Sequence, residues 1–128
     1  MIKQVNVIIK LVIISLVFSL SSCSKDDNEP TINGNYYVKY VIKGNGAYSR
    51  FSNWNVTTPE GEYTNNGTQV RSWEQTYGPV SKGFKCEVKV NSYISGAPTI
   101  EILVSKNNEP FSLKASQTGN NASYIIDF

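Results

Sequence analysis

The sequence predicts an all-β protein, a single immunoglobulin-like β-sandwich of about seven antiparallel strands that follows a signal peptide and an acidic tether. Three observations predict this class. Short runs rich in aromatic and β-branched residues alternate apolar with polar positions. Clusters of Gly, Asn and Pro separate these runs and supply the residues that tight turns require. The roughly 100 residues after the tether match the length of one such domain.

The first half of the predicted domain contains three of these strands. Residues 35–43 form the first, because Tyr and β-branched residues occupy alternate positions. A turn at 44–46 leads into the second strand at 48–56. The polar segment 58–67 contains Pro, Gly and Asn and is expected to form turns, and residues 71–75 continue as strand.

The second half contains the clearest alternation in the chain. Residues 84–91 place apolar side chains on one face and charged or amide side chains on the other. Residues 99–105 and 111–116 flank a polar tip and are expected to pair as a hairpin. Residues 122–128 form the last strand, and no helix is expected.

The first 22 residues have the three parts of an export signal. Lys3 and Lys10 form the positive region, residues 11–20 form the apolar stretch, and small residues precede Cys23. The apolar stretch is too short to span a bilayer as a helix, which needs about 20 apolar residues. We therefore expect residues 1–22 to be a cleaved signal peptide.

The segment Leu20–Cys23, which reads Leu-Ser-Ser-Cys, resembles the lipobox of bacterial lipoproteins. The resemblance implies cleavage before Cys23 and attachment of acyl chains such as palmitate to that residue, which together hold a protein on a membrane. The alternative is an ordinary signal peptide that happens to contain a cysteine. The lipidated residue would begin a flexible acidic tether, residues 23–33, that leads into the β-sandwich domain at residues 34–128.

The residues after the cysteine indicate where the protein is delivered. Lys25, Asp26 and Asp27 resemble the Lys-acid-acid export signal of surface lipoproteins of the Bacteroidetes. The preceding residue is Ser24 rather than the Asp of the inner-membrane retention signal known from enterobacterial lipoproteins. The resemblance implies an outer-membrane protein that is anchored by its N-terminal lipid and faces the cell exterior.

The order of features along the domain is similar to that of the soluble domain of the MmpS-type membrane proteins and of related β-sandwich lipoproteins. The matching segments are Tyr40–Gly44, Ser72–Glu74, Lys82–Phe84, Ile100–Val104 and Ala122–Tyr124. The chain departs from the family in having Ser-Trp where the family has Pro-Trp, and a lipid tether in place of an uncleaved helix. The resemblance implies a β-sandwich and, as an alternative function, an accessory role beside an envelope transporter.

The sequence lacks an obvious catalytic constellation. There is no histidine, which is the commonest general base and metal ligand. Ser72 lacks the flanking glycines of a nucleophile elbow. Cys86, the only cysteine besides Cys23, is expected to be buried without a disulfide partner. Glu60 and Glu62 bracket a turn, where two carboxylates rarely face each other across a substrate. We expect no enzyme, catalytic residue, metal site or cofactor, and a small envelope hydrolase is the weaker alternative.

The charge of the mature chain gives no support for nucleic-acid binding. Removing Lys3 and Lys10 from the twelve basic residues leaves ten, which equals the ten acidic residues. The lysines of the domain are scattered rather than clustered into a stripe. Nucleic acid is therefore not an expected partner.

Aromatic residues are the candidates for contact with a ligand. Trp54, Tyr63 and Tyr77 lie in the first half of the domain and could offer ring faces with polar edges to a glycan or a protein. The alternative is that Trp73, and with it Trp54, fills the sandwich core. We expect Trp73 in the core and Tyr63 exposed. The sequence thus predicts a non-catalytic binding module, with strand addition at a sheet edge as a further way to bind a partner.

Overall fold

The computed structural model describes residues 35–128, and every regular element in this range is a β-strand. The chain divides into two units, Met1–Ile32 and Asn33–Phe128, and the second contains the described domain. No helix in residues 35–128 is long and apolar enough to cross a membrane. The strands are β1 (Tyr36–Lys43), β2 (Arg50–Thr58), β3 (Gly61–Val70), β4 (Ser72–Val80), β5 (Lys85–Ile94), β6 (Thr99–Lys106), β7 (Ser112–Thr118) and β8 (Asn121–Ile125).

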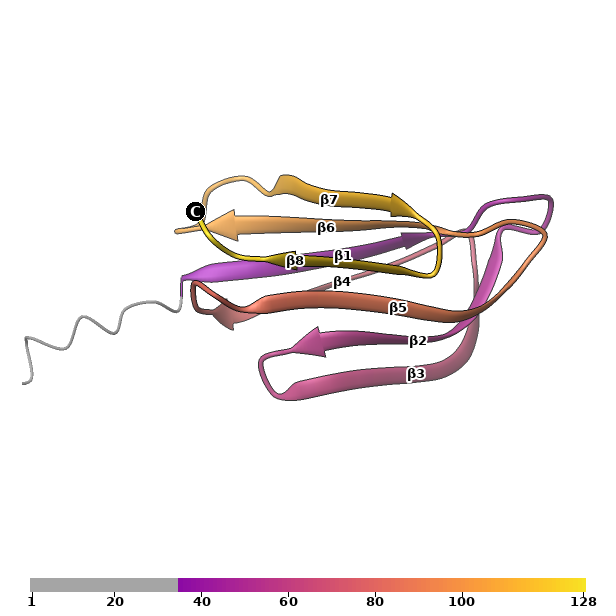
Figure 1. Cartoon of the computed structure of the whole chain (residues 1–128), viewed down its shortest axis with the longest axis horizontal. Helices are drawn as coiled ribbons and strands as arrows, with labels where there is room; N and C mark the ends of the chain where they lie inside the picture. The colour runs from indigo at the N-terminus through magenta and orange to yellow at the C-terminus, as the bar shows by residue number, and fades with distance from the viewer. Residues whose placement is uncertain (1–34) are drawn as a thin grey trace, which may run out of the picture. The chain divides into compact units, whose positions relative to one another are not determined.

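The eight strands form two four-stranded sheets that pack face to face (Figure 1). One sheet has the order β4-β1-β6-β7 and the other β3-β2-β5-β8, and the paired strands are antiparallel. The predicted fold class, an all-β sandwich, is therefore confirmed. The expected hairpin of the second half is also confirmed, because β6 pairs with β7 around a short loop.

One strand more is present than the sequence predicts, and that strand is β3. The segment 58–67 was expected to form turns, but residues 61–70 pair with β2 along their length. The strand lies at the edge of its sheet, and none of its residues is buried. Because a solvated edge strand needs no apolar face, its sequence lacks the alternation by which strands are recognised.

The core lies between the sheets and is built from alternate positions of the central strands, as their period of two predicts. β5 turns Cys86, Val88 and Val90 inward, and each is at most 1% exposed. The fully buried side chains of largest volume are Trp54, Tyr40, Phe51, Ile42, Ile100, Ile102, Ile126, Val38, Val56, Val88, Val90 and Val104.

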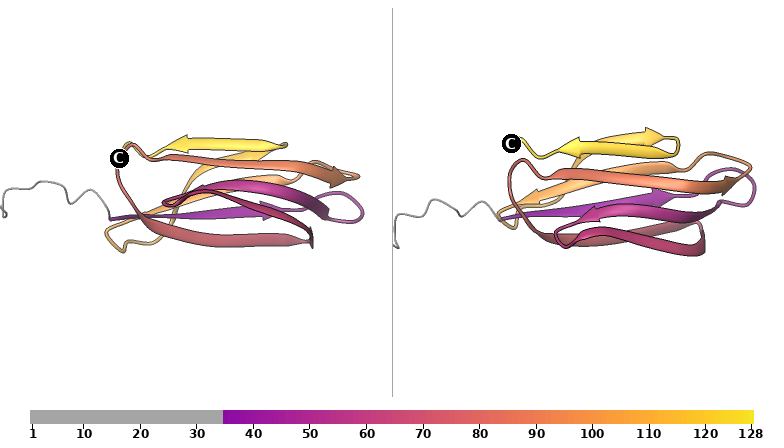
Figure 2. Two further views of the ribbon diagram at one scale, coloured as in Figure 1. Left: turned by 90° about the horizontal axis from the view of Figure 1, so that it is seen from below. Right: turned by 60° about the horizontal axis from the view of Figure 1, so that its bottom comes forward.

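The connections between strands lie at two opposite ends of the sandwich (Figures 1 and 2). The chain enters the domain at Asn35, beside the β6–β7 loop, where the backbone N–H of Asn107 donates to the carbonyl oxygen of Asn35 at 3.0 Å. The β1–β2, β3–β4, β5–β6 and β7–β8 connections lie at the opposite end, which we call the distal end.

Candidate functional site

Of the three aromatic residues predicted to contact a ligand, Trp54 lies in the core. Its side chain is 1% exposed and packs against Phe51 and Trp73, with ring centroids 5.1 Å and 5.6 Å away. β2 is an inner strand of its sheet, and the inward face of that strand is covered by the other sheet. The prediction of Trp54 as a ligand contact is therefore wrong, because neighbouring side chains cover its ring.

Tyr63 and Trp73 lie at the surface, along one side of the sandwich. Tyr63 belongs to β3 and Trp73 to β4, and each strand is the edge of its own sheet. The two rings are parallel within 4°, with centroids 6.4 Å apart, so they stack across the opening between the sheets. Tyr63 is 40% exposed, as expected. Trp73, expected in the core, is only partly buried against it.

Tyr77 completes this group, which we call the aromatic edge (Tyr63, Trp73 and Tyr77). On β4 it lies four residues after Trp73, and both pair with inward-facing residues of β1, so they share a face. Tyr77 packs against Tyr40 at 6.0 Å. Its pKa is raised by burial and, to a smaller degree, by the nearby hydroxyl of Tyr63. Two of the three predicted residues, Tyr63 and Tyr77, therefore belong to the same site.

Amide side chains accompany the aromatic rings on both strands. The Nδ2 of Asn65 donates to the hydroxyl of Tyr63 at 3.2 Å, and its Oδ1 accepts from the backbone N–H of Gly67 at 2.7 Å. On β4, Gln75 pairs with Tyr40 and shares the face of Trp73. The edge therefore combines ring faces with exposed amide donors and acceptors.

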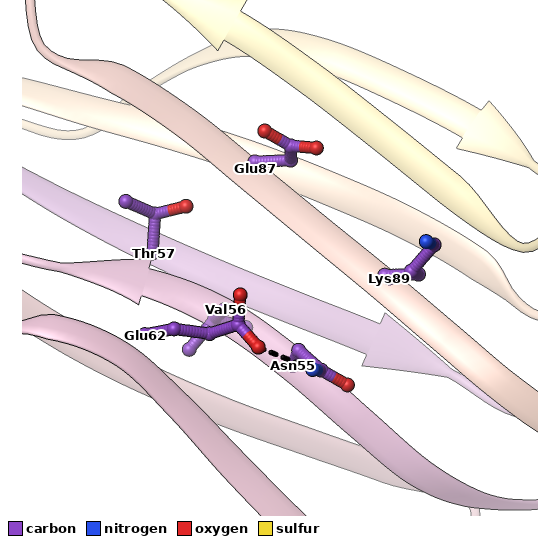
Figure 3. Close-up of a pocket in the computed structure, with 6 residues that line it drawn as sticks. All are labelled: Asn55, Val56, Thr57, Glu62, Glu87 and Lys89. Atoms are coloured by element: carbon purple, nitrogen blue, oxygen red, sulfur yellow. Dashed lines mark hydrogen bonds between the residues drawn. The ribbon is translucent and has the colours of Figure 1, made fainter.

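The outer face of the β3-β2-β5-β8 sheet carries a polar hollow of about 200 Å³ (Figure 3). Its polar lining comes from three neighbouring strands: Asn55 and Thr57 of β2, Glu62 of β3, and Glu87 and Lys89 of β5. Thr57 lies opposite Glu62 in the β2–β3 register, and Asn55 lies opposite Lys89 in the β2–β5 register. Sequence reasoning missed this hollow, because the register that brings Glu62 and Glu87 to one face cannot be deduced from either strand alone.

The carboxylates of the hollow are engaged by neighbouring side chains. The Nδ2 of Asn55 donates to the Oε1 of Glu62 at 2.6 Å, and Lys85 forms an ion pair with Glu87 at 3.5 Å. Within residues 35–128, no group of three or more His, Cys, Asp or Glu side chains could hold a metal ion. The arrangement suits hydrogen bonding to a polar ligand rather than acid–base chemistry.

Cys86 is buried in the core and is not activated. Burial raises the pKa of its thiol to about 11, although a hydrogen bond with Tyr40 acts in the opposite direction. The thiol is therefore protonated at neutral pH, whereas the thiolate is the nucleophilic form.

No protein-family model matches the chain, and no curated protein matches it either. The predicted signal peptide at residues 1–22, the lipidation residue Cys23 and the export residues Lys25, Asp26 and Asp27 lie outside the described residues.

Proposed function

We propose that this protein is a lipoprotein of the outer membrane, anchored through acyl chains on Cys23 and facing the cell exterior, whose β-sandwich is a non-catalytic binding module. The sequence before the domain supports the anchor, because Leu20–Cys23 resembles a lipobox and Lys25–Asp27 resembles a surface-export signal. The sandwich supports the binding role, because one side of this scaffold carries an aromatic group in which Tyr63 is exposed and Trp73 and Tyr77 are half-buried.

The observation that carries the binding proposal is the stack of Tyr63 on Trp73 at the open side of the sandwich. Aromatic rings that are partly exposed bind the apolar C–H faces of sugar rings, and adjacent amides bind sugar hydroxyl groups. The aromatic edge supplies both, with Asn65 and Gln75 beside the rings. We therefore propose a glycan as the ligand of this edge.

A glycan array that displays neutral and acidic oligosaccharides tests this proposal with purified protein and three variants. Tyr63→Ala and Trp73→Ala are expected to weaken binding of the retained glycans by roughly tenfold each, as the loss of a central aromatic contact does. Tyr93→Ala is the matched control, because Tyr93 is 44% exposed against 40% for Tyr63 and belongs to β5 rather than to the edge.

The three variants also separate the ways in which this proposal could fail. If no glycan binds, or if Tyr63→Ala leaves binding unchanged, the aromatic edge is not a glycan site. If only Tyr93→Ala weakens binding, the glycan binds elsewhere on the domain. Circular dichroism of each variant excludes loss of fold as the cause.

Glu62 and Glu87, the two carboxylates that line the polar hollow, are the pair that a hydrolase could use there. Both are engaged by neighbours, and the hollow lies on the outer face of one sheet, where it is lined by side chains of three adjacent strands (Figure 3). Turnover of a glycan that is abolished by Glu87→Gln would contradict the non-catalytic proposal.

A further inference from the structure

The distal end of the sandwich carries a cluster of exposed apolar side chains. Four of the seven large hydrophobic residues that are exposed in residues 35–128 lie there: Tyr48 (63% exposed), Val70 (47%), Tyr93 (44%) and Ile94 (49%). Register brings Val70 and Ile94 together, because both pair with Arg50 of β2. Tyr93 pairs with Phe51, the next residue of β2, and Tyr48 lies in the β1–β2 connection at the same end. A cluster of this kind on a soluble domain marks an interaction surface more often than isolated exposed residues do.

The same end is positively charged. The distal segments 44–50, 70–72 and 93–99 contain Arg50 and Arg71 and no Asp or Glu. Within the part of the chain that the structure describes, neither arginine forms an ion pair, whereas Lys43 at the margin pairs with Glu101 at 2.7 Å. We call this surface, defined by the four apolar residues with Arg50 and Arg71, the distal tip.

The loops of the distal tip are held together by backbone and amide hydrogen bonds. The N–H of Arg71 donates to the carbonyl oxygen of Ser49 at 2.8 Å, and its own carbonyl oxygen accepts from the N–H of Gly44 at 2.6 Å. The Nδ2 of Asn45 donates to the carbonyl oxygen of Ala97 at 2.9 Å. The β1–β2 loop is therefore tied both to the β3–β4 connection and to the β5–β6 loop. Such a surface loses little conformational entropy when a partner binds.

The backbone of these loops is also strained. Ser49, Arg71 and Ser95 have φ values of 48°, 74° and 64°, a left-handed conformation that non-glycine residues rarely adopt. Strain of this kind is concentrated at functional sites, where the surrounding structure maintains it. The tip therefore combines apolar exposure, unpaired positive charge and a fixed, strained backbone.

We propose that the distal tip docks a partner protein through an acidic segment that carries an apolar or aromatic side chain. The unpaired guanidinium groups of Arg50 and Arg71 select carboxylates, because arginine binds them in a bidentate geometry. Tyr48, Tyr93 and Ile94 provide the apolar contact, and tyrosine and arginine are the residues that most often dominate protein interfaces.

A protein is favoured over a lipid surface by the position of the tip. β1 runs from the end where the chain enters the domain to the distal end, and its eight residues span about 26 Å. The chain that leads from Cys23 enters at Asn35, so on the proposed anchoring the tip is the end of the domain opposite the attachment. The preference for a protein over a lipid surface rests on the proposed lipid anchor, whereas the contact chemistry of the tip does not depend on it.

Site-specific photo-crosslinking in intact cells tests the proposal. The crosslinking residue p-benzoylphenylalanine replaces Tyr48 or Ile94 in the full-length protein. Leu113 and Ile125 are the matched control positions, because they are 53% and 55% exposed and lie outside the distal tip. We expect a discrete protein adduct from both tip positions and none from the controls, with the crosslinked peptide of the partner rich in Asp and Glu.

Charge reversal provides the second readout. Arg50→Glu combined with Arg71→Glu is expected to reduce the adduct by roughly tenfold. Arg50→Lys combined with Arg71→Lys is expected to reduce it less, because lysine keeps the positive charge and loses only the bidentate geometry. The backbone hydrogen bonds of Arg71 do not involve its side chain, and unchanged thermal melting verifies that the fold is kept. Tyr63→Ala is expected to leave the adduct unchanged, which separates this surface from the aromatic edge.

Several outcomes would overturn the proposal. These are equal adducts at Leu113 and Ile125, an adduct that is insensitive to charge reversal, and no adduct at either tip position. An adduct of twice the chain mass would assign the surface to a second copy, and an adduct to polysaccharide would assign it to a glycan. Binding of purified protein to vesicles of phosphatidylethanolamine and phosphatidylglycerol, lost on charge reversal, would assign it to a membrane.

Discussion

Substitution of Trp54 tests whether this residue belongs to the core or to a ligand site. The side chain is 1% exposed, and its Nε1 has no hydrogen-bond partner among the described residues. Removal of a buried Trp side chain costs about 3–5 kcal/mol, and removal of an unpaired buried N–H returns about 1–3 kcal/mol. Trp54→Ala is therefore expected to lower the free energy of unfolding by about 2 kcal/mol.

Trp54→Phe separates the two contributions. Phe keeps an aromatic contact with Phe51 and Trp73, loses the unpaired N–H and leaves a cavity of roughly 40 Å³, which costs about 1 kcal/mol at 24 cal/mol per Å³. Because the lost N–H offsets that cost, the free energy of unfolding should change by less than about 1 kcal/mol.

Urea denaturation followed by far-UV circular dichroism measures both variants. A change below about 1 kcal/mol for Trp54→Ala would show that the residue is not in the core. A loss above about 2 kcal/mol for Trp54→Phe would show that the indole N–H is hydrogen-bonded in solution. Neither variant should alter glycan binding as long as the domain remains folded.

Two further predictions concern pH and backbone conformation. The Cys86 thiol should contribute a fall of up to about 2 kcal/mol in the free energy of unfolding as pH rises from 9.0, its ordinary pKa, to about 11, its pKa in the folded protein. The reason is that the thiol ionises first in the unfolded chain. The buried Tyr40, whose pKa is also raised, adds to the fall above pH 10 in wild-type and variant alike. Urea titrations across this range should show a smaller slope for Cys86→Ala, and an equal slope would contradict the pKa shift. Gly46→Ala should destabilise the protein more than Gly61→Ala. Both glycines have positive φ, but a Cβ on Gly46 would lie 2.5 Å from the carbonyl oxygen of Ser95, whereas a Cβ on Gly61 meets nothing within 4 Å. Equal melting temperatures for the two variants would show that the distal loops are not packed together.

The fold class follows from the sequence because the central strands are buried on one face and therefore alternate strictly. β5 is the clearest example, with three buried and three exposed residues in turn from Lys85 to Val90. β3 gives no such signal, since an edge strand with polar side chains has the composition of a loop. The strand that the sequence fails to predict is therefore the one that buries no residue in the core.

The sequence did not distinguish the two tryptophans for a related reason: Trp54 is fully buried, whereas Trp73, expected in the core, is partly buried against it. Trp54 and Trp73 both occupy inward-facing strand positions, so alternation cannot distinguish them. What separates them is the place of each strand in its sheet, because β2 is internal and β4 is an edge. Sheet order depends on long-range pairing, which a single strand's sequence does not reveal. The sequence also failed to indicate the distal tip, because the loops of the tip come together only through that pairing.

Protease treatment of intact cells tests most directly the central claim that this is a lipid-anchored domain facing outward. The measurement compares wild-type protein with Cys23→Ala, and permeabilised cells show that the folded domain can be digested. We expect proteinase K to remove the wild-type domain from intact cells and the Cys23→Ala protein to leave the membrane fraction. Digestion of the wild-type domain only after permeabilisation would place it in the periplasm, and a Cys23→Ala protein that stays in the membrane fraction would contradict the lipid anchor.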